Sequence, residues 1–178
     1  MRLILDLEDV TILILTASTD KKINGRTAIQ KLVYFCVNSL KLENDFIPHY
    51  FGPYSSYVDA TLNRLVSLGL VDEKPLLIQN GRRMYSYSLT QDGLFYSKKL
   101  LTDNKRNYTA IKKIVSIFEK LEGNRINRLS CAAKIHYLAR INKGLTIESA
   151  IEKAKSLGWE LNEKEIINAV KTIKNISR

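Results

Sequence analysis

The chain of 178 residues contains little glycine, proline, cysteine or histidine. Its 8 glycines and 3 prolines leave little room for a long disordered linker or for an all-β fold with many tight turns. The two cysteines, Cys36 and Cys131, lack CxxC spacing, and the two histidines, His49 and His136, lie far apart in the sequence. These spacings argue against a zinc site. We expect both cysteines to be buried structural thiols and the protein to use no metal or other cofactor.

Long apolar runs are also missing. The longest nearly uncharged stretch near the N-terminus, residues 10–19, is about half of the roughly 20 residues that a bilayer span requires. Asp6, Glu8 and Asp9 precede it, where a signal peptide would carry positive charge. We therefore expect a cytoplasmic protein with no membrane partner. The chain lacks a Walker loop, a dinucleotide fingerprint and clustered acids for nuclease metals, so we expect that it is not an enzyme.

Positive charge is abundant and unevenly distributed. The chain carries a net charge of +10, and residues 104–178 hold 16 cations against 7 acids. Such asymmetry is typical of proteins with a polyanionic partner, either nucleic acid or an acidic protein. A solvated helix face that serves solubility would give the same composition.

Apolar residues recur at helical spacing in three segments of the first 70 residues. They predict a helix over 7–18, a second helix capped by Thr27, and a third helix that ends at Gly69. Ser56 and Asp59 have the spacing of a capping box at the start of the third helix.

The helical spacing disappears from Lys74 to Thr90. This stretch is divided by Asn80 and Gly81, a pair typical of the type I′ turn, and it predicts a β-hairpin. Helical spacing then returns and predicts five more helices, over residues 91–101, 105–121, 126–141, 146–157 and 162–176.

Three helices followed by a hairpin is the order of a winged helix-turn-helix. The sequence therefore predicts a mostly α fold with a small β-hairpin. We expect a winged helix-turn-helix domain over residues 1–103 and a basic C-terminal helical extension, residues 104–178, packed on it. Helices that follow a wing can pair between copies, so a homodimer remains an open alternative.

Two residue clusters carry a family resemblance: Gln30–Tyr34 (QKLVY) and His49–Ser55 (HYFGPYS). Both resemble the YwgA-like winged-helix proteins and, more widely, the Panacea group of SocA-like antitoxin domains. The segment Tyr85–Gly93 (YSYSLTQDG) resembles the end of a wing that leads into a helix. The resemblance covers about residues 7–98 and implies a winged-helix fold. It leaves the activity open between a regulator and an antitoxin-like or adaptor protein.

A DNA-binding winged helix would place its third helix in the major groove and its hairpin against the backbone. The residues that we expect at such an interface are Ser55, Ser56, Tyr57 and Arg64 of the third helix, Arg82 and Arg83 of the wing tip, and Lys105, Arg106, Lys112 and Lys113 of a basic ridge after Asn104. Hydroxyls and free N–H groups at a helix start bind phosphate. Capping and aromatic packing explain the start of the third helix equally well, and solvation explains the wing arginines.

Two functions follow as hypotheses. The first is a DNA-binding winged-helix protein, a transcriptional or defence-related regulator with double-stranded DNA as its partner. The second keeps the fold as a non-catalytic protein-interaction module, antitoxin-like or an adaptor subunit, whose basic second half binds an acidic protein partner. The weakly basic third helix favours the second hypothesis.

Overall fold

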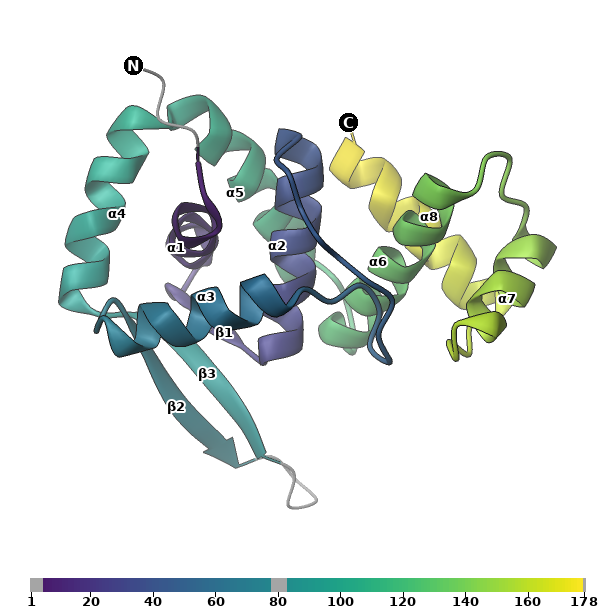
Figure 1. The fold of residues 1–178 in the computed structure, drawn as a ribbon, viewed down its shortest axis with the longest axis horizontal. Coiled ribbons are helices and arrows are strands. Elements are labelled where there is room, and N and C mark those ends of the chain that lie inside the picture. Colours follow the sequence, from purple (N-terminus) through teal and green to yellow (C-terminus); the bar gives the residue numbers. More distant parts are fainter. Residues whose placement is uncertain (1–4, 78–82, 178) are drawn as a thin grey trace.

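The computed structural model describes residues 5–77 and 83–177 (Figure 1). The helices are α1 (Leu7–Ala17), α2 (Arg26–Leu40), α3 (Ser56–Ser67), α4 (Gln91–Asp103), α5 (Lys105–Glu119), α6 (Arg125–Ile141), α7 (Ile147–Ser156) and α8 (Glu163–Ser177). The strands are β1 (Lys22–Asn24), β2 (Val71–Leu77) and β3 (Arg83–Leu89). The expected fold class, mostly α with a small β-hairpin, is confirmed. Across the described ranges, no helix combines the length and apolar character needed to cross a bilayer.

Helix α1 lies at the centre of the first half of the molecule. Figure 1 shows it end-on, with α2, α3, α4 and α5 around it. Every residue from Val10 to Thr16 is buried, as expected for a helix that is apolar on all sides. The hydroxyls of Thr11 and Thr16 donate to carbonyl oxygens one turn earlier, at 2.7 Å each, so their burial leaves no unpaired polar group.

The three strands form an antiparallel sheet in the order β1-β3-β2. The β2–β3 hairpin projects from the helices as a wing (Figure 1). Pro75 lies in β2, which is an edge strand and therefore tolerates a residue without an N–H donor. The turn predicted at Asn80 and Gly81 lies outside the described residues. Strand β1 was not predicted, because three residues are too few to establish a period.

Two helix starts differ from the sequence prediction. Helix α2 begins at Arg26 after Gly25, whose φ of 93° favours glycine, so Thr27 is not its cap. Helix α3 is capped by Ser55 rather than Ser56: the Ser55 hydroxyl accepts from the N–H of Val58 at 3.5 Å. The cap of α2 lies two residues before the predicted one, and the cap of α3 lies one residue before it.

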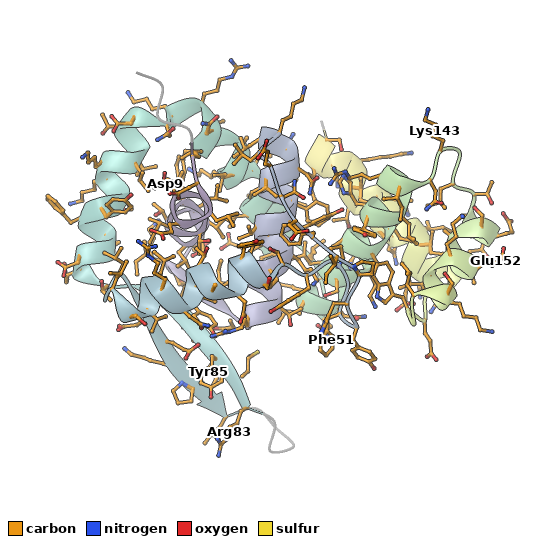
Figure 2. All side chains as sticks on the ribbon, in the orientation of Figure 1. Asp9, Phe51, Arg83, Tyr85, Lys143 and Glu152 are labelled. Carbon is orange, nitrogen blue, oxygen red and sulfur yellow. The ribbon has the colours of Figure 1, made fainter. Side chains whose placement is uncertain are left out.

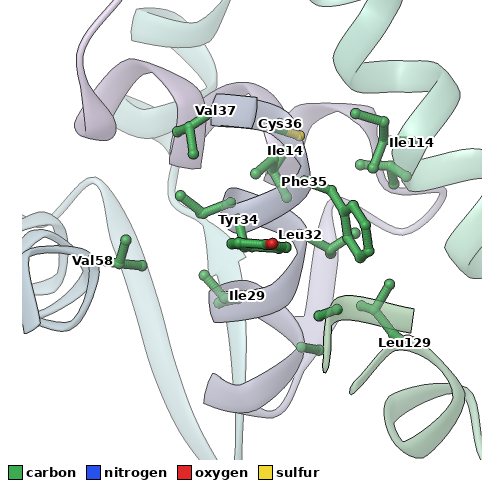
Figure 3. Close-up of a cluster of buried hydrophobic side chains, with 14 of the residues drawn as sticks. Ile14, Ile29, Leu32, Tyr34, Phe35, Cys36, Val37, Val58, Ile114 and Leu129 are labelled. Carbon is green, nitrogen blue, oxygen red and sulfur yellow. The ribbon is translucent and has the colours of Figure 1, made fainter. Parts of the chain in front are cut away.

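The helices after the wing share the core of the helices before it. Helices α4 and α5, which flank the boundary predicted after Asp103, both pack on α1, while α6 packs on α2. Figure 3 shows Phe35 of α2 among apolar side chains that include Ile114 of α5 and Leu129 of α6. Helices α7 and α8 pack on α6 and complete the C-terminal end.

Candidate nucleic-acid interface

The outward face of α3 is polar and free of acids. Its exposed residues are Ser56, Tyr57, Ala60, Asn63, Arg64 and Ser67. Val58, Leu62 and Leu65 are buried on the opposite face of the helix. This helical periodicity leaves one complete side of α3 open to a partner.

Ser55 is not part of that open face. It is buried, and its backbone exchanges two hydrogen bonds with the Gln30 side chain: the N–H donates to Oε1 at 3.1 Å and the carbonyl accepts from Nε2 at 2.9 Å. Together with the cap to Val58, these bonds occupy its polar groups. The structure therefore favours the capping alternative for Ser55, whereas Ser56 and Tyr57 remain accessible.

Arg64 forms an ion pair within the chain, with Glu8. Its Nε lies 3.0 Å from Oε1 of Glu8 in α1, and its side chain is 68% exposed. An ion pair this exposed contributes little to stability. It does reduce the positive charge that the outer face of α3 presents to a phosphate.

Arg26 joins α3 to the wing. Its guanidinium donates to Oδ1 of Asp59 at 2.9 Å and to Oδ1 of Asn63 at 2.8 Å, both in α3. It also donates to Oε1 of Glu73 in β2 at 2.9 Å and to the Tyr87 hydroxyl in β3 at 3.1 Å. The Tyr87 hydroxyl donates in turn to Glu73 at 2.5 Å, and this bond is the largest influence that lowers the Glu73 pKa. One side chain thus fixes the helix relative to the hairpin.

The described part of the wing carries two exposed cations. Arg83 lies at the far end of β3 (Figure 2), and Lys74 of β2 is 3.5 Å from Oδ2 of Asp72. Arg82, the other predicted wing contact, lies outside the described residues. Asp59 and Glu73 pair with Arg26, and Asp72 pairs with Lys74. The described α3–wing surface is therefore close to neutral in net charge.

Helix α5 carries the basic ridge. Lys105, Arg106, Lys112 and Lys113 are all exposed, while Ile111, Ile114 and Val115 are buried on the other side of the helix. Helix α1 packs on both α5 and α3, and α5 lies on the other side of α1 from α3 (Figure 1). Only the C-terminal end of α5 approaches the hairpin, where Phe118 and Glu119 line a cavity with β1 and with Met84 of β3. The predicted contacts therefore form two separate surfaces, α3 with the wing and the ridge of α5, instead of one.

An exposed aromatic loop, which is not among the sequence-predicted contacts, lies between α2 and α3. Tyr50 is 71% exposed and Phe51 is 54% exposed, and their rings meet edge to face at 4.9 Å between centroids. Ile47, beside them, is exposed as well. Figure 2 shows Phe51 at the outer end of the loop. The aromatic cluster around Gly52 is the signal for this loop, but in the sequence it supports only the family resemblance.

Three contacts hold this loop in place. The Lys31 ammonium, which is buried, donates to the carbonyl of Pro53 at 2.7 Å. The indole N–H of Trp159 donates to the carbonyl of His49 at 2.7 Å. Gly52, at a φ of 96°, lies against Lys134, where a Cβ would come within 3.1 Å of Cγ. The two clusters singled out in the sequence, around Lys31 and around Gly52, are therefore in direct contact.

The cysteines and His136 are buried or partly buried within the helices. Cys36 and Cys131 are both buried free thiols, and burial raises the pKa of each. Nδ1 of His136 lies 2.8 Å from the Tyr34 hydroxyl, and burial lowers the His136 pKa to about 4. Within residues 5–77 and 83–177, no three His, Cys, Asp or Glu side chains come together as a metal-ligand set.

Comparison of the chain with protein-family models and with curated proteins finds no match.

Proposed function

We propose that the chain is a DNA-binding winged-helix protein with a regulatory role, which contacts duplex DNA through α3 and the β2–β3 wing. The observation that carries the proposal is the Arg26 network, which holds an exposed, acid-free helix face at a constant angle to the hairpin. A rigid helix and wing suit the simultaneous contact of a groove and the adjoining backbone. The proposal includes membership of the YwgA-like winged-helix proteins and assigns no catalytic role.

The chemistry of the surface sets the kind of binding that we expect. Ser56 and Tyr57 offer hydroxyls at the start of α3, where free backbone N–H groups and the helix dipole favour phosphate. Asn63 uses its oxygen for Arg26, which leaves its amide NH₂ as a donor. With few cations on this surface, we expect phosphate positioning to contribute more than base reading.

Fluorescence anisotropy with a labelled duplex of about 25 base pairs tests the proposal. We choose Ser56→Glu, because a carboxylate in the first turn stabilises the helix while it repels phosphate. Arg83→Glu reverses the wing charge. Lys143→Glu is the matched control, since Lys143 is exposed beyond α6, far from the wing (Figure 2).

At low salt we expect the wild type to bind, with an apparent affinity at least about tenfold weaker for Ser56→Glu and Arg83→Glu. The Lys143→Glu protein should stay within about twofold of wild type. Absence of binding by the wild type at low salt would refute the proposal. Equal effects of Arg83→Glu and Lys143→Glu would show that only net charge matters.

The aromatic loop supports a second candidate function, that of a protein-interaction module. Tyr50 and Phe51 present large apolar surface on a loop whose backbone is held by Lys31 and Trp159. Exposed aromatics on a preorganised backbone are typical of binding hot spots. An adaptor or antitoxin-like protein would use this loop and leave α3 uninvolved.

Affinity capture from the native host with three baits separates the two functions. The baits are the wild type, Tyr50→Ser/Phe51→Ser and Arg83→Glu, each treated with nuclease. An adaptor retains one stoichiometric protein on the wild type and on Arg83→Glu and loses it on the loop variant. If all three baits recover the same proteins, the loop is not the docking site.

A further inference from the structure

The outer face of α5, together with Lys120 at its C-cap, is basic. Lys105, Lys112 and Lys120 recur at intervals close to two helical turns, and Arg106 and Lys113 lie beside them on the same side. All five residues are exposed. At 1.5 Å per residue, the surface from Lys105 to Lys120 is about 22 Å long. We call these five residues the α5 ridge.

The ridge is not neutralised by the rest of the chain. The salt bridges of the described residues involve the cations Arg26, Arg64 and Lys74, and none of them involves a residue of the α5 ridge. Glu119, the acid of α5, is engaged elsewhere: its carboxylate accepts from the backbone N–H and the hydroxyl of Thr19, both at 2.8 Å. Lys113 makes one long contact, 3.5 Å to the carbonyl of Ile176.

The ridge also lacks apolar anchors. Ile111, Ile114 and Val115 of α5 are buried, and Tyr108 and Phe118 pack against the core. Ile117 is half-buried, and no described large hydrophobic side chain of α5 is exposed. A helix that binds a lipid surface presents bulky apolar residues beside its cations. A protein hot spot needs a central aromatic or aliphatic anchor. A surface of cations and small polar groups instead complements the phosphate backbone of nucleic acid, which is bound chiefly by counterion release.

We propose that the α5 ridge is a second binding face for double-stranded nucleic acid, so that one chain holds two duplex segments on opposite sides of α1. The proposal rests on the proposed function, because α3 and the wing supply the first face. A duplex carries one phosphate charge per roughly 1.7 Å of axis, or about a dozen along the length of the ridge. Helices α3 and α5 pack on different sides of α1, which directs the two faces toward different duplex segments (Figure 1).

The test uses the full chain and two unlabelled or dye-labelled duplexes of about 25 base pairs. The ridge variant is Lys105→Gln/Lys112→Gln/Lys120→Gln, which removes three charges and retains good helix formers. The matched control is Lys143→Gln/Lys153→Gln/Lys155→Gln, which removes three exposed charges from the α7 end of the molecule. Arg83→Glu reports on the first face.

Energy transfer between a donor-labelled and an acceptor-labelled duplex measures bridging. We expect transfer with the wild type and the control, maximal near one chain per two duplexes and lost at protein excess. The ridge variant should still bind a single duplex in anisotropy but lose the transfer. Binding that remains in Arg83→Glu goes chiefly through the ridge, so adding the ridge substitutions to that variant should make its plot of log affinity against log salt shallower by about 2 to 3, since each phosphate contact contributes about 0.9 to the slope.

Sedimentation of the free protein excludes a simpler route to bridging. A dimer with one binding face per chain also joins two duplexes, and a ridge variant that dissociates it would lose energy transfer while each chain still binds one duplex. Loss of transfer with retained single-duplex binding is therefore specific to a second face when the wild type and the ridge variant both sediment as monomers.

Four results would overturn the proposal. The first is the absence of energy transfer with the wild type. The second is a ridge variant that gives the same energy transfer as the control variant. If Arg83→Glu alone abolishes all binding, the proposed function stands and the ridge does not. Binding of phosphatidylglycerol vesicles that the ridge variant loses, with its duplex binding unchanged, would assign the ridge to a lipid surface.

Discussion

The Lys31 ammonium donates to the carbonyl of Pro53 at 2.7 Å from a side chain that is only 2% exposed. This bond connects α2 to the loop that carries the exposed aromatics. Burial, and secondly the charge of Lys134, lower the Lys31 pKa from 10.5 to about 7. The protein therefore places a group that ordinarily carries a charge where the charged form is costly.

The lowered Lys31 pKa makes the free energy of unfolding depend on pH in the neutral to alkaline range. Between pH 7 and 10.5 the unfolded chain binds more protons at this group than the folded chain, so the free energy of unfolding rises with pH. The rise is at most about 1.4 kcal/mol per pH unit. Urea unfolding from pH 7 to 9.5 should show it in the wild type and in Lys112→Met, but not in Lys31→Met. Parallel curves for all three proteins would contradict the assignment.

His136 makes the free energy of unfolding rise with pH in the acid range, as Lys31 does in the alkaline range. Burial, followed by the charge of Arg140, lowers its pKa from 6.5 to about 4, so the unfolded state binds more protons between these values. Acidification from pH 6.5 to 4 should cost the wild type roughly 1–3 kcal/mol. The variant His136→Phe should lose this component, whereas His49→Gln, at an exposed histidine, should retain it. The hypothesis fails if His136→Phe shows the same loss as wild type.

Breaking the Arg26 network should destabilise the link between α3 and the wing. Arg26→Gln leaves Asp59 and Glu73 without their cation, and we expect a loss of about 1–2 kcal/mol, limited by solvent because the Arg26 side chain is 35% exposed. Arg64→Gln removes the more exposed pair with Glu8 and should cost no more than about 0.5 kcal/mol. Urea unfolding gives both values. Similar losses for the two variants would contradict a special role for Arg26.

Gly93 should be the least replaceable glycine described. A Cβ at this position would lie 2.1 Å from the carbonyl oxygen of Leu70, so α4 must move away from the segment that joins α3 to β2. We expect Gly93→Ala to cost about 3 kcal/mol or more in unfolding free energy. Gly69→Ala, at a φ of 69° with no atom within 4 Å, should cost only roughly 1–2 kcal/mol. Equal melting temperatures for the two variants would refute the steric argument.

Sequence patterns predicted the helices because their signals are local. The apolar period of α6 predicts residues 126–141 against an observed Arg125–Ile141, and that of α8 predicts 162–176 against Glu163–Ser177. Caps were less accurate, since Ser55 and Ser56 have equal capping propensity and only the bond to Gln30 distinguishes them. Strand β1 depends on pairing with β3, a contact across more than 60 residues that no local period encodes.

Residue types and short-range spacing are enough to specify the mostly helical class, the hairpin and the basic character of the second half, because each depends on a few turns of chain. Which cations share a surface depends on how the helices pack. The packing of α3 and α5 on different sides of α1 directs Lys105 and Lys112 away from α3, and the approach of α1 to α3 pairs Arg64 with Glu8. Such pairings arise when buried faces associate, and the distance between two charges along the chain does not specify them.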